Sequence, residues 1–211
     1  MESLMYQDSN FVGVFVVVLF FFAYFLHTYG YRKQHLSLLL LFCLAICTFS
    51  RASILTIPLF YFIFKYARRL SFNKVIPVIL VGGIIIGLVI SLRQFFFVKV
   101  SLSLKLMIIS LAQDFWRDSP LVTQLLGVGF GNTYSNIGIG SHNIIVTYLM
   151  ESGVIGVVLL LALWWMIALK TRFKAILILL PFGFNAMSLA GHGVPYLYCS
   201  LGLLYVMHKK G

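Results

Sequence analysis

Residues 11–30 read FVGVFVVVLFFFAYFLHTYG, a stretch with no Asp, Glu, Lys or Arg. An α-helix needs about 20 predominantly apolar residues to cross the hydrocarbon core of a bilayer. The rest of the chain is similar, because 61% of its 211 residues are hydrophobic and 10% are charged, whereas a soluble fold needs more polar surface. The sequence therefore predicts an all-α integral membrane protein, a single membrane domain (residues 1–211) with about seven transmembrane helices, near 11–30, 36–50, 53–67, 75–92, 143–169, 175–190 and 194–207.

The placement of charge predicts how these helices are oriented. Eleven of the 16 Lys and Arg residues fall at 32–33, 65–74, 170–174 and 209–210, with no acidic residue among them. These segments fall on one side of the predicted membrane, and all five acidic residues fall on the other side. Cytoplasmic loops carry the excess of Lys and Arg, so we expect the basic segments in the cytoplasm and the N-terminus outside. We expect no cleavable signal peptide. The net charge of +11 is therefore a topology signal, and we expect no nucleic-acid partner.

One long segment, residues 93–142, is expected to lie on the outer side as a loop. Within it, residues 100–116 predict a helix at the membrane interface. Residues 127–141 contain five glycines and predict a loop, because glycine interrupts regular elements. The run 127–131 (GVGFG) superficially resembles a nucleotide-binding loop. It lacks the preceding strand and the lysine of such a loop, so we do not expect it to bind a nucleotide. No cluster of ligands at the usual spacing predicts a metal site.

Ser50 and Arg51 separate the second and third predicted helices on the outer side. A guanidinium presents a planar fork of donors that matches the oxygens of a phosphate. Arg51 is therefore a candidate phosphate-binding residue. The alternative is an arginine that only extends its charged end to the membrane interface.

Ser141, His142 and Asn143 open the fifth predicted helix. Ser141 is a plausible N-cap, which predicts that His142 lies on the first helical turn, beside unpaired N–H groups and the positive end of the helix dipole. That field favours a neutral imidazole, which can accept a proton. The alternative is a histidine that serves as a cap or a surface residue.

Glu151, Gly153 and Gly156 follow in the same predicted helix. On a continuous helix, both glycines share a face with His142 and would let another helix pack closely below it, while Glu151 points to the opposite face. The segment is longer than the apolar thickness of a bilayer, which predicts Glu151 near the outer interface. Glu151 is a candidate for either a structural hydrogen bond or a catalytic role.

Together these residues resemble the signature of the O-antigen ligase-like superfamily, which contains bacterial O-antigen ligases and polysaccharide repeat-unit polymerases. His142-Asn143, followed by Gly153 and Gly156, resembles its histidine element. Ser50-Arg51-Ala52-Ser53 resembles its Ser-Arg element. The element that precedes the histidine is similar to Pro120 followed by Leu126-Gly127-Val128-Gly129-Phe130-Gly131-Asn132.

The resemblance implies a role for each of these residues. Arg51 would bind a pyrophosphate together with Lys105, which stands where the family usually has an arginine, or with Arg93. His142 would orient or deprotonate the attacking hydroxyl of an acceptor sugar, with no cofactor and no metal. Family members are commonly far longer, so we expect this chain to correspond to their C-terminal half. The supporting residues would be Ser50, Gly127, Gly129, Gly131, Asn132, Ser141, Asn143, Glu151, Gly153 and Gly156.

The resemblance also implies a function and partners. We expect a multi-pass glycosyltransferase of the bacterial inner membrane that polymerises undecaprenyl-pyrophosphate-linked repeat units of O-antigen or capsule. Its partners would be membrane lipid, a chain-length regulator and a flippase. One alternative is an O-antigen ligase that transfers finished polymer to lipid A-core. Alternatives of another class are a polysaccharide flippase or transporter, which predicts charged or broken helices at the midplane, and a non-catalytic assembly subunit.

Overall fold

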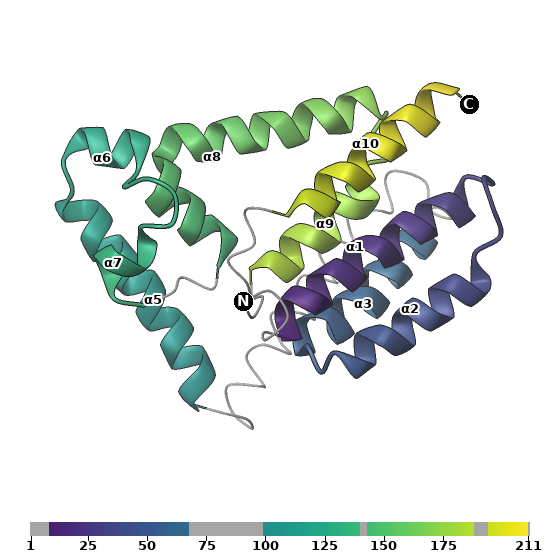
Figure 1. Cartoon of the computed structure of the whole chain (residues 1–211), viewed down its shortest axis with the longest axis horizontal. Coiled ribbons are helices and arrows are strands. Elements are labelled where there is room, and N and C mark those ends of the chain that lie inside the picture. The colour runs from purple at the N-terminus through teal and green to yellow at the C-terminus, as the bar shows by residue number, and fades with distance from the viewer. Residues whose placement is uncertain (1–8, 68–98, 140–142, 188–193, 211) are drawn as a thin grey trace, which may run out of the picture.

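The computed structural model describes residues 9–67, 99–139, 143–187 and 194–210. Within these ranges the chain forms helices joined by turns and loops, and it contains no strand. The helices, labelled in Figure 1, are α1 (Ser9–Thr28), α2 (His35–Cys47), α3 (Arg51–Ala67), α5 (Lys99–Asp118), α6 (Leu121–Leu126), α7 (Thr133–Ile137), α8 (Ile144–Lys170), α9 (Ile176–Ala186) and α10 (Pro195–Lys210).

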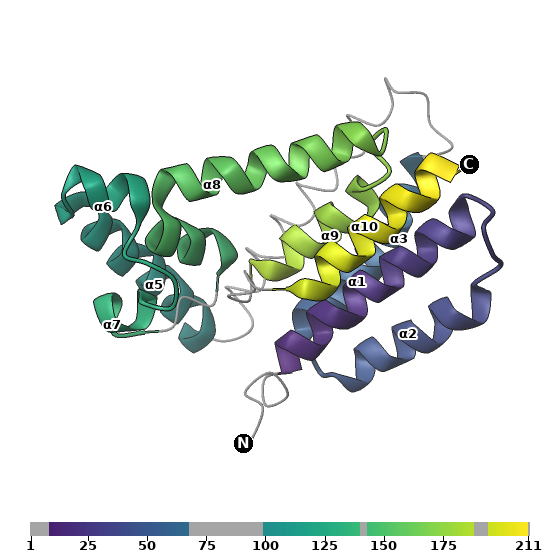
Figure 2. The same cartoon turned by 45° about the horizontal axis from the view of Figure 1, so that its top comes forward.

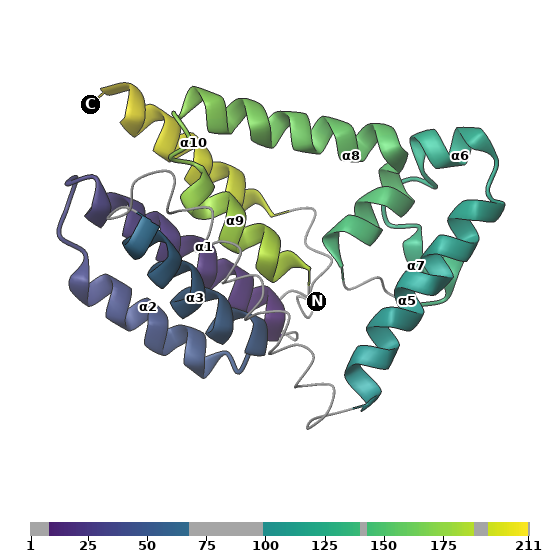
Figure 3. The ribbon, with the colours of Figure 1, turned by 180° about the vertical axis from the view of Figure 1, so that it is seen from behind.

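Five of these helices, α1, α2, α3, α9 and α10, form a bundle in which α1 packs against the other four (Figures 1 and 3). The central position of α1 follows from its sequence, because a helix that is apolar on all sides is most stable when it is surrounded. Val14, Phe21 and Phe25 of α1 are fully buried. The ring of Phe21 meets that of Phe64 in α3 edge to face, at 5.9 Å and 89°, a favourable geometry for aromatic pairs.

The helices of the bundle alternate in direction, which brings the basic residues of several turns to one end. At this end the Tyr31 hydroxyl donates to the Met207 carbonyl over 2.9 Å, and Lys174 Nζ lies 3.0 Å from His208 Nδ1. We call it the basic end. At the opposite end, which we call the Arg51 end, α1 and α3 begin and α9 finishes.

Helix α8 is the longest of the described helices, with 27 residues, and it is kinked at Gly153, whose φ and ψ are 63° and −169°. Its N-terminal part packs against α5, α6 and α7, and its C-terminal part extends to the basic end (Figures 1 and 2). In that C-terminal part, large apolar side chains such as Val158, Leu159 and Trp165 are exposed. An apolar surface of this extent on a helix is suited to a hydrocarbon environment.

Helices are present near six of the seven predicted spans, while their crossing of a membrane stays a prediction, and the seventh, 75–92, lies outside the described residues. Two described helices, Asn10–Thr28 and Ile144–Lys170, have the length and the apolar composition needed to cross a membrane. Helices α2 and α9 are apolar but have only 13 and 11 residues, fewer than the about 20 that span a bilayer as a straight helix.

The segment predicted as an outer loop contains more regular structure than expected. The predicted helix over 100–116 is present as α5, while its position at a membrane interface stays a prediction. The prediction that 127–141 is entirely a loop is wrong, because α7 forms within it. Gly138 ends this short helix in the left-handed conformation, with φ of 72°, which glycine adopts without steric cost. The glycines therefore delimit a helical turn instead of excluding one.

Candidate functional site

The glycine-rich loop after α6 is joined to the kink of α8 by backbone hydrogen bonds. Val128 donates its N–H to the Met150 carbonyl over 2.8 Å, and Gly129 donates to the Glu151 carbonyl over 3.0 Å. The kink at Gly153 interrupts the regular i to i+4 pattern of α8, and carbonyls at such a break need other donors. The loop supplies these donors, so the loop and the kink form one structural unit.

Gly127 and Gly153 allow this close approach. A Cβ atom on Gly127 would collide with the backbone of Glu151 and Ser152, and one on Gly153 would collide with the Leu125 carbonyl. Both glycines also have positive φ values, 78° and 63°, where other residues are strained. Each glycine is therefore required by contact and by conformation together.

The carboxyl group of Glu151 lies beneath the same loop. Glu151 is 4% exposed, and its Oε1 accepts a hydrogen bond of 3.0 Å from the hydroxyl of Thr133, the first residue of α7. Thr133 thus fixes α7 to the kink of α8, and Glu151 has the structural hydrogen bond that was one of its two predicted roles.

The glycine-rich loop is also closed by bonds within itself. Asn132 donates from its side-chain amide to the Val128 carbonyl over 3.0 Å and from its backbone N–H to the Gly129 carbonyl over 3.3 Å. Gly129 and Gly131 both have positive φ, 90° and 79°. These contacts explain why the motif combines alternating glycines with an asparagine.

Helix α8 begins later than the sequence predicts. Its first residue is Ile144, and its N-cap is Asn143, whose Oδ1 accepts hydrogen bonds from Ile145 N (2.9 Å) and Val146 N (3.3 Å). The prediction of Ser141 as the N-cap is therefore wrong. Ser141 and His142 lie outside the described residues.

The prediction that Gly153 and Gly156 follow His142 on one continuous helix is also wrong for the described part of that helix. That prediction assumed a continuous helix, and the conformation of Gly153 breaks α8 between the two ends of the motif. Among the described residues, the atoms that a Cβ on Gly156 would meet belong to the side chain of Ser152 in α8 itself and not to a second helix.

A second cluster surrounds Ser50 at the Arg51 end. The Ser53 hydroxyl donates to Ser50 Oγ over 3.0 Å, and Ser50 Oγ donates to Asn10 Oδ1 over 3.1 Å. Asn185 of α9 donates its amide to Ser53 Oγ over 2.9 Å. Ser50, Ser53 and Asn185 are all buried, and Gly13 of α1 lies so close to both serines that a Cβ atom there would collide with them. This polar chain ties α1, α3 and α9 together.

Arg51 is the first residue of α3 and directly follows this chain. Its side chain is exposed, so the guanidinium stands at a helix N-terminus, above a buried and hydrogen-bonded base. The start of α8 lies on the same side of the bundle as the start of α3 (Figures 1 and 3). Of the other predicted cations, Lys105 belongs to α5, with a side chain outside the described part, and Arg93 lies outside it altogether.

Three residues of these clusters are absent from the prediction: Thr133, Asn10 and Asn185. None belongs to a motif, and each is distant in sequence from its partner, Thr133 by 18 residues and Asn185 by 132. In the described parts of the chain, no group of three or more His, Cys, Asp or Glu side chains could hold a metal ion. No protein-family model, curated protein or solved structure matches this chain.

Proposed function

We propose that this chain is a membrane glycosyltransferase that polymerises undecaprenyl-pyrophosphate-linked polysaccharide repeat units on the outer face of the bacterial inner membrane. The proposal rests on the resemblance to the O-antigen ligase-like superfamily. The observation that best supports it is the contact between Gly127 and Gly153. These glycines belong to two separate elements of the resemblance. Their contact is expected if the two elements form one structural unit.

In the proposed reaction, a hydroxyl oxygen of the acceptor sugar attacks the anomeric carbon of the lipid-linked donor. The bond between this carbon and the pyrophosphate oxygen breaks, and undecaprenyl pyrophosphate leaves with the bonding electrons. His142 orients the hydroxyl and accepts its proton, a contribution of about 100- to 10,000-fold for a general base. Arg51, with Lys105 or Arg93, stabilises the negative charge that develops on the pyrophosphate.

The surroundings of Arg51 support this role. A pyrophosphate-binding side chain works best on a rigid element whose position is fixed before the ligand arrives. The buried chain from Asn10 through Ser50 and Ser53 to Asn185 provides such a base. The guanidinium also lies at the N-terminus of α3, and the positive end of a helix dipole favours an anion.

Elongation of a lipid-linked repeat unit by the purified protein tests the proposal. We expect His142→Ala to lower the rate at least about 100-fold and Arg51→Lys to lower it through the loss of the two-pronged contact. Arg117→Ala is the matched control, because Arg117 is an exposed cation at the end of α5 and should leave the rate unchanged. Normal elongation by His142→Ala would overturn the catalytic assignment.

The host strain distinguishes polymerase from ligase. Disruption of the gene should leave lipid A-core capped with a single repeat unit if the chain is a polymerase. Uncapped core together with accumulated lipid-linked polymer would instead identify a ligase.

A further inference from the structure

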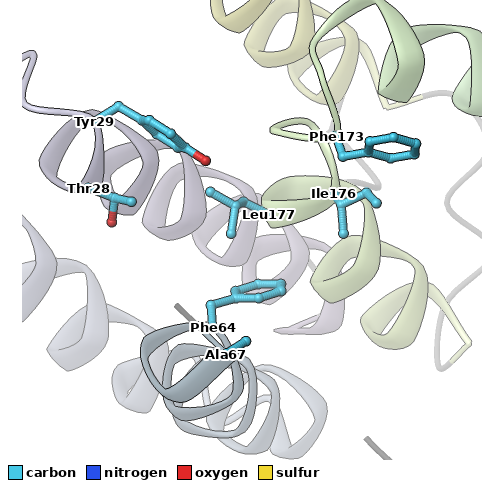
Figure 4. Close-up of a pocket in the computed structure, with 7 residues that line it drawn as sticks. All are labelled: Thr28, Tyr29, Phe64, Ala67, Phe173, Ile176 and Leu177. Atoms are coloured by element: carbon cyan, nitrogen blue, oxygen red, sulfur yellow. The ribbon is translucent and has the colours of Figure 1, made fainter. Parts of the chain in front are cut away.

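A cavity of about 290 Å³ opens at the basic end of the bundle, between the ends of α1 and α3 and the start of α9. Figure 4 shows the side chains that line it. Its walls are mainly apolar, and they include Phe64 and Ala67 from α3, Ile176 and Leu177 from α9, Thr28 and Tyr29 from the end of α1, and Phe173. Such a lining is suited to a hydrocarbon chain.

Lys174 is a cation beside this cavity. Its ammonium lies 4.4 Å from the centre of the Tyr29 ring, so it stands over a residue of the cavity wall. It also lies 3.0 Å from His208 Nδ1. Desolvation and the charges of Lys174 and Arg172 lower the pKa of His208, which favours the neutral imidazole that can accept from an ammonium. Two neighbours therefore hold Lys174 at the opening.

The turn between α8 and α9 fixes Arg172 and Phe173 beside Lys174. Arg172 and Phe173 both adopt positive φ, 49° and 62°, a conformation that is unfavourable for L-residues and persists where the surroundings enforce it. The buried hydroxyl of Thr171 provides this restraint, since it donates to the Ile167 carbonyl over 2.8 Å and accepts from Ala175 N over 3.2 Å. The cations and the aromatic ring are thus positioned by the fold itself.

The described charged side chains around this opening are all basic. Lys65, Lys170 and Lys209 also belong to this end, with exposed side chains. The acidic side chains of the described residues, Asp114, Asp118 and Glu151, lie instead in α5 and at the kink of α8. No described carboxylate therefore neutralises the cations around the cavity.

We propose that this cavity binds an anionic phospholipid, with one acyl chain against the apolar walls and the phosphate facing Lys174 and Arg172. Basic pockets between membrane helices are suited to such head groups, since cation and hydrocarbon are recognised side by side. A soluble phosphate would contact only the cations, and a neutral lipid would contact only the apolar walls of the cavity. The inference rests on the membrane placement of the helices and not on transferase activity.

Native mass spectrometry of the purified chain in detergent tests this inference with phosphatidylglycerol and phosphatidylcholine of identical acyl chains. We expect phosphatidylglycerol to bind more tightly. Each of Lys174→Gln and Arg172→Gln should weaken its binding about fivefold, the effect of one cation near an anionic lipid. Arg117→Gln removes the same charge from α5 and should bind like the wild type. His142→Ala should also bind normally, which separates this test from that of the transferase.

A second variant examines the apolar walls. Ala67→Phe places a ring at the edge of the cavity and should weaken phosphatidylglycerol binding without changing the cations. If this variant does not fold, glycerol phosphate replaces it as a probe on the wild-type chain and should not compete with the lipid. Equal binding of the two phospholipids, equal effects of Lys174→Gln and Arg117→Gln, competition by glycerol phosphate, or a second copy of the chain at the cavity would each overturn the proposal.

Discussion

Gly153 combines backbone angles that only glycine adopts readily with a position against the Leu125 carbonyl. The sequence suggested a different reason for this glycine, namely close packing of another helix. A glycine within an apolar run has no local feature that separates a helical residue from a kinked one. The distinction comes from the loop at 127–131. Its N–H groups can donate to carbonyls of α8 only where the hydrogen bonds within that helix are interrupted.

This difference predicts opposite effects for two glycine substitutions. Gly153→Ala should destabilise the protein by about 1–3 kcal/mol from backbone strain alone, with the collision added to it. Gly202 lies in α10 with open space around it, so Gly202→Ala should stabilise the protein by about 0.5–1 kcal/mol through helix propensity. Thermal unfolding in detergent, followed by tryptophan fluorescence, measures both effects. Equal changes in the two midpoints would contradict the assignment of Gly153 as a kink residue.

At the scale of the element, α8 is defined by its cap, its kink and its exposed second half. The sequence predicts this helix because its apolar run is long, but it places the start at Ser141 instead of Asn143. Both residue types are good N-caps, and they stand two positions apart, so propensity alone does not choose between them. In the structure, Ile144 is buried in the bundle core, and this packing favours a helix that begins there.

The cap at Asn143 makes a measurable contribution. Asn143→Ala removes the acceptor for Ile145 N and Val146 N and should lower the free energy of unfolding by about 1 kcal/mol. Asn143→Asp keeps an acceptor of the same shape and should retain most of the stability. Thermal unfolding midpoints of the two variants provide the comparison, and an equal loss in both would contradict the capping role.

At the scale of the whole molecule, the order of the helices collects Arg32, Lys33, Lys170 and Lys174 at one end of the bundle and places Ser50 and Arg51 at the other. This agrees with the sorting of charge predicted from the sequence, because short turns between antiparallel helices necessarily alternate between the two ends. The location of the basic end in the cytoplasm stays a prediction. The polar chain that joins Ser53 to Asn185 could not be predicted, since serine and asparagine in apolar helices do not specify their partners.

Labelling of single cysteines tests this orientation in intact cells. In a background with Cys43, Cys47 and Cys199 replaced by alanine, Tyr134→Cys in α7 should react with a membrane-impermeant maleimide added outside spheroplasts. Lys33→Cys should react only after the membrane is permeabilised, because cytoplasmic turns carry the excess of basic residues. Tyr134 is 67% exposed, so access within the protein is not the limiting factor. Labelling of both positions from the same side would contradict the predicted topology.

The contact of Gly127 with Gly153 also has an evolutionary consequence. Each glycine occupies space that a side chain on the other segment would need, and neither backbone conformation suits another residue. A lineage that replaces one of them must reshape the loop and the kink together, so intermediate sequences are disfavoured. The exposed apolar residues in the second half of α8, such as Val158 and Leu159, have no such constraint among the described residues, and they can exchange freely for other apolar residues. We expect relatives of this protein to differ widely along that half while keeping or losing the two glycines as a pair.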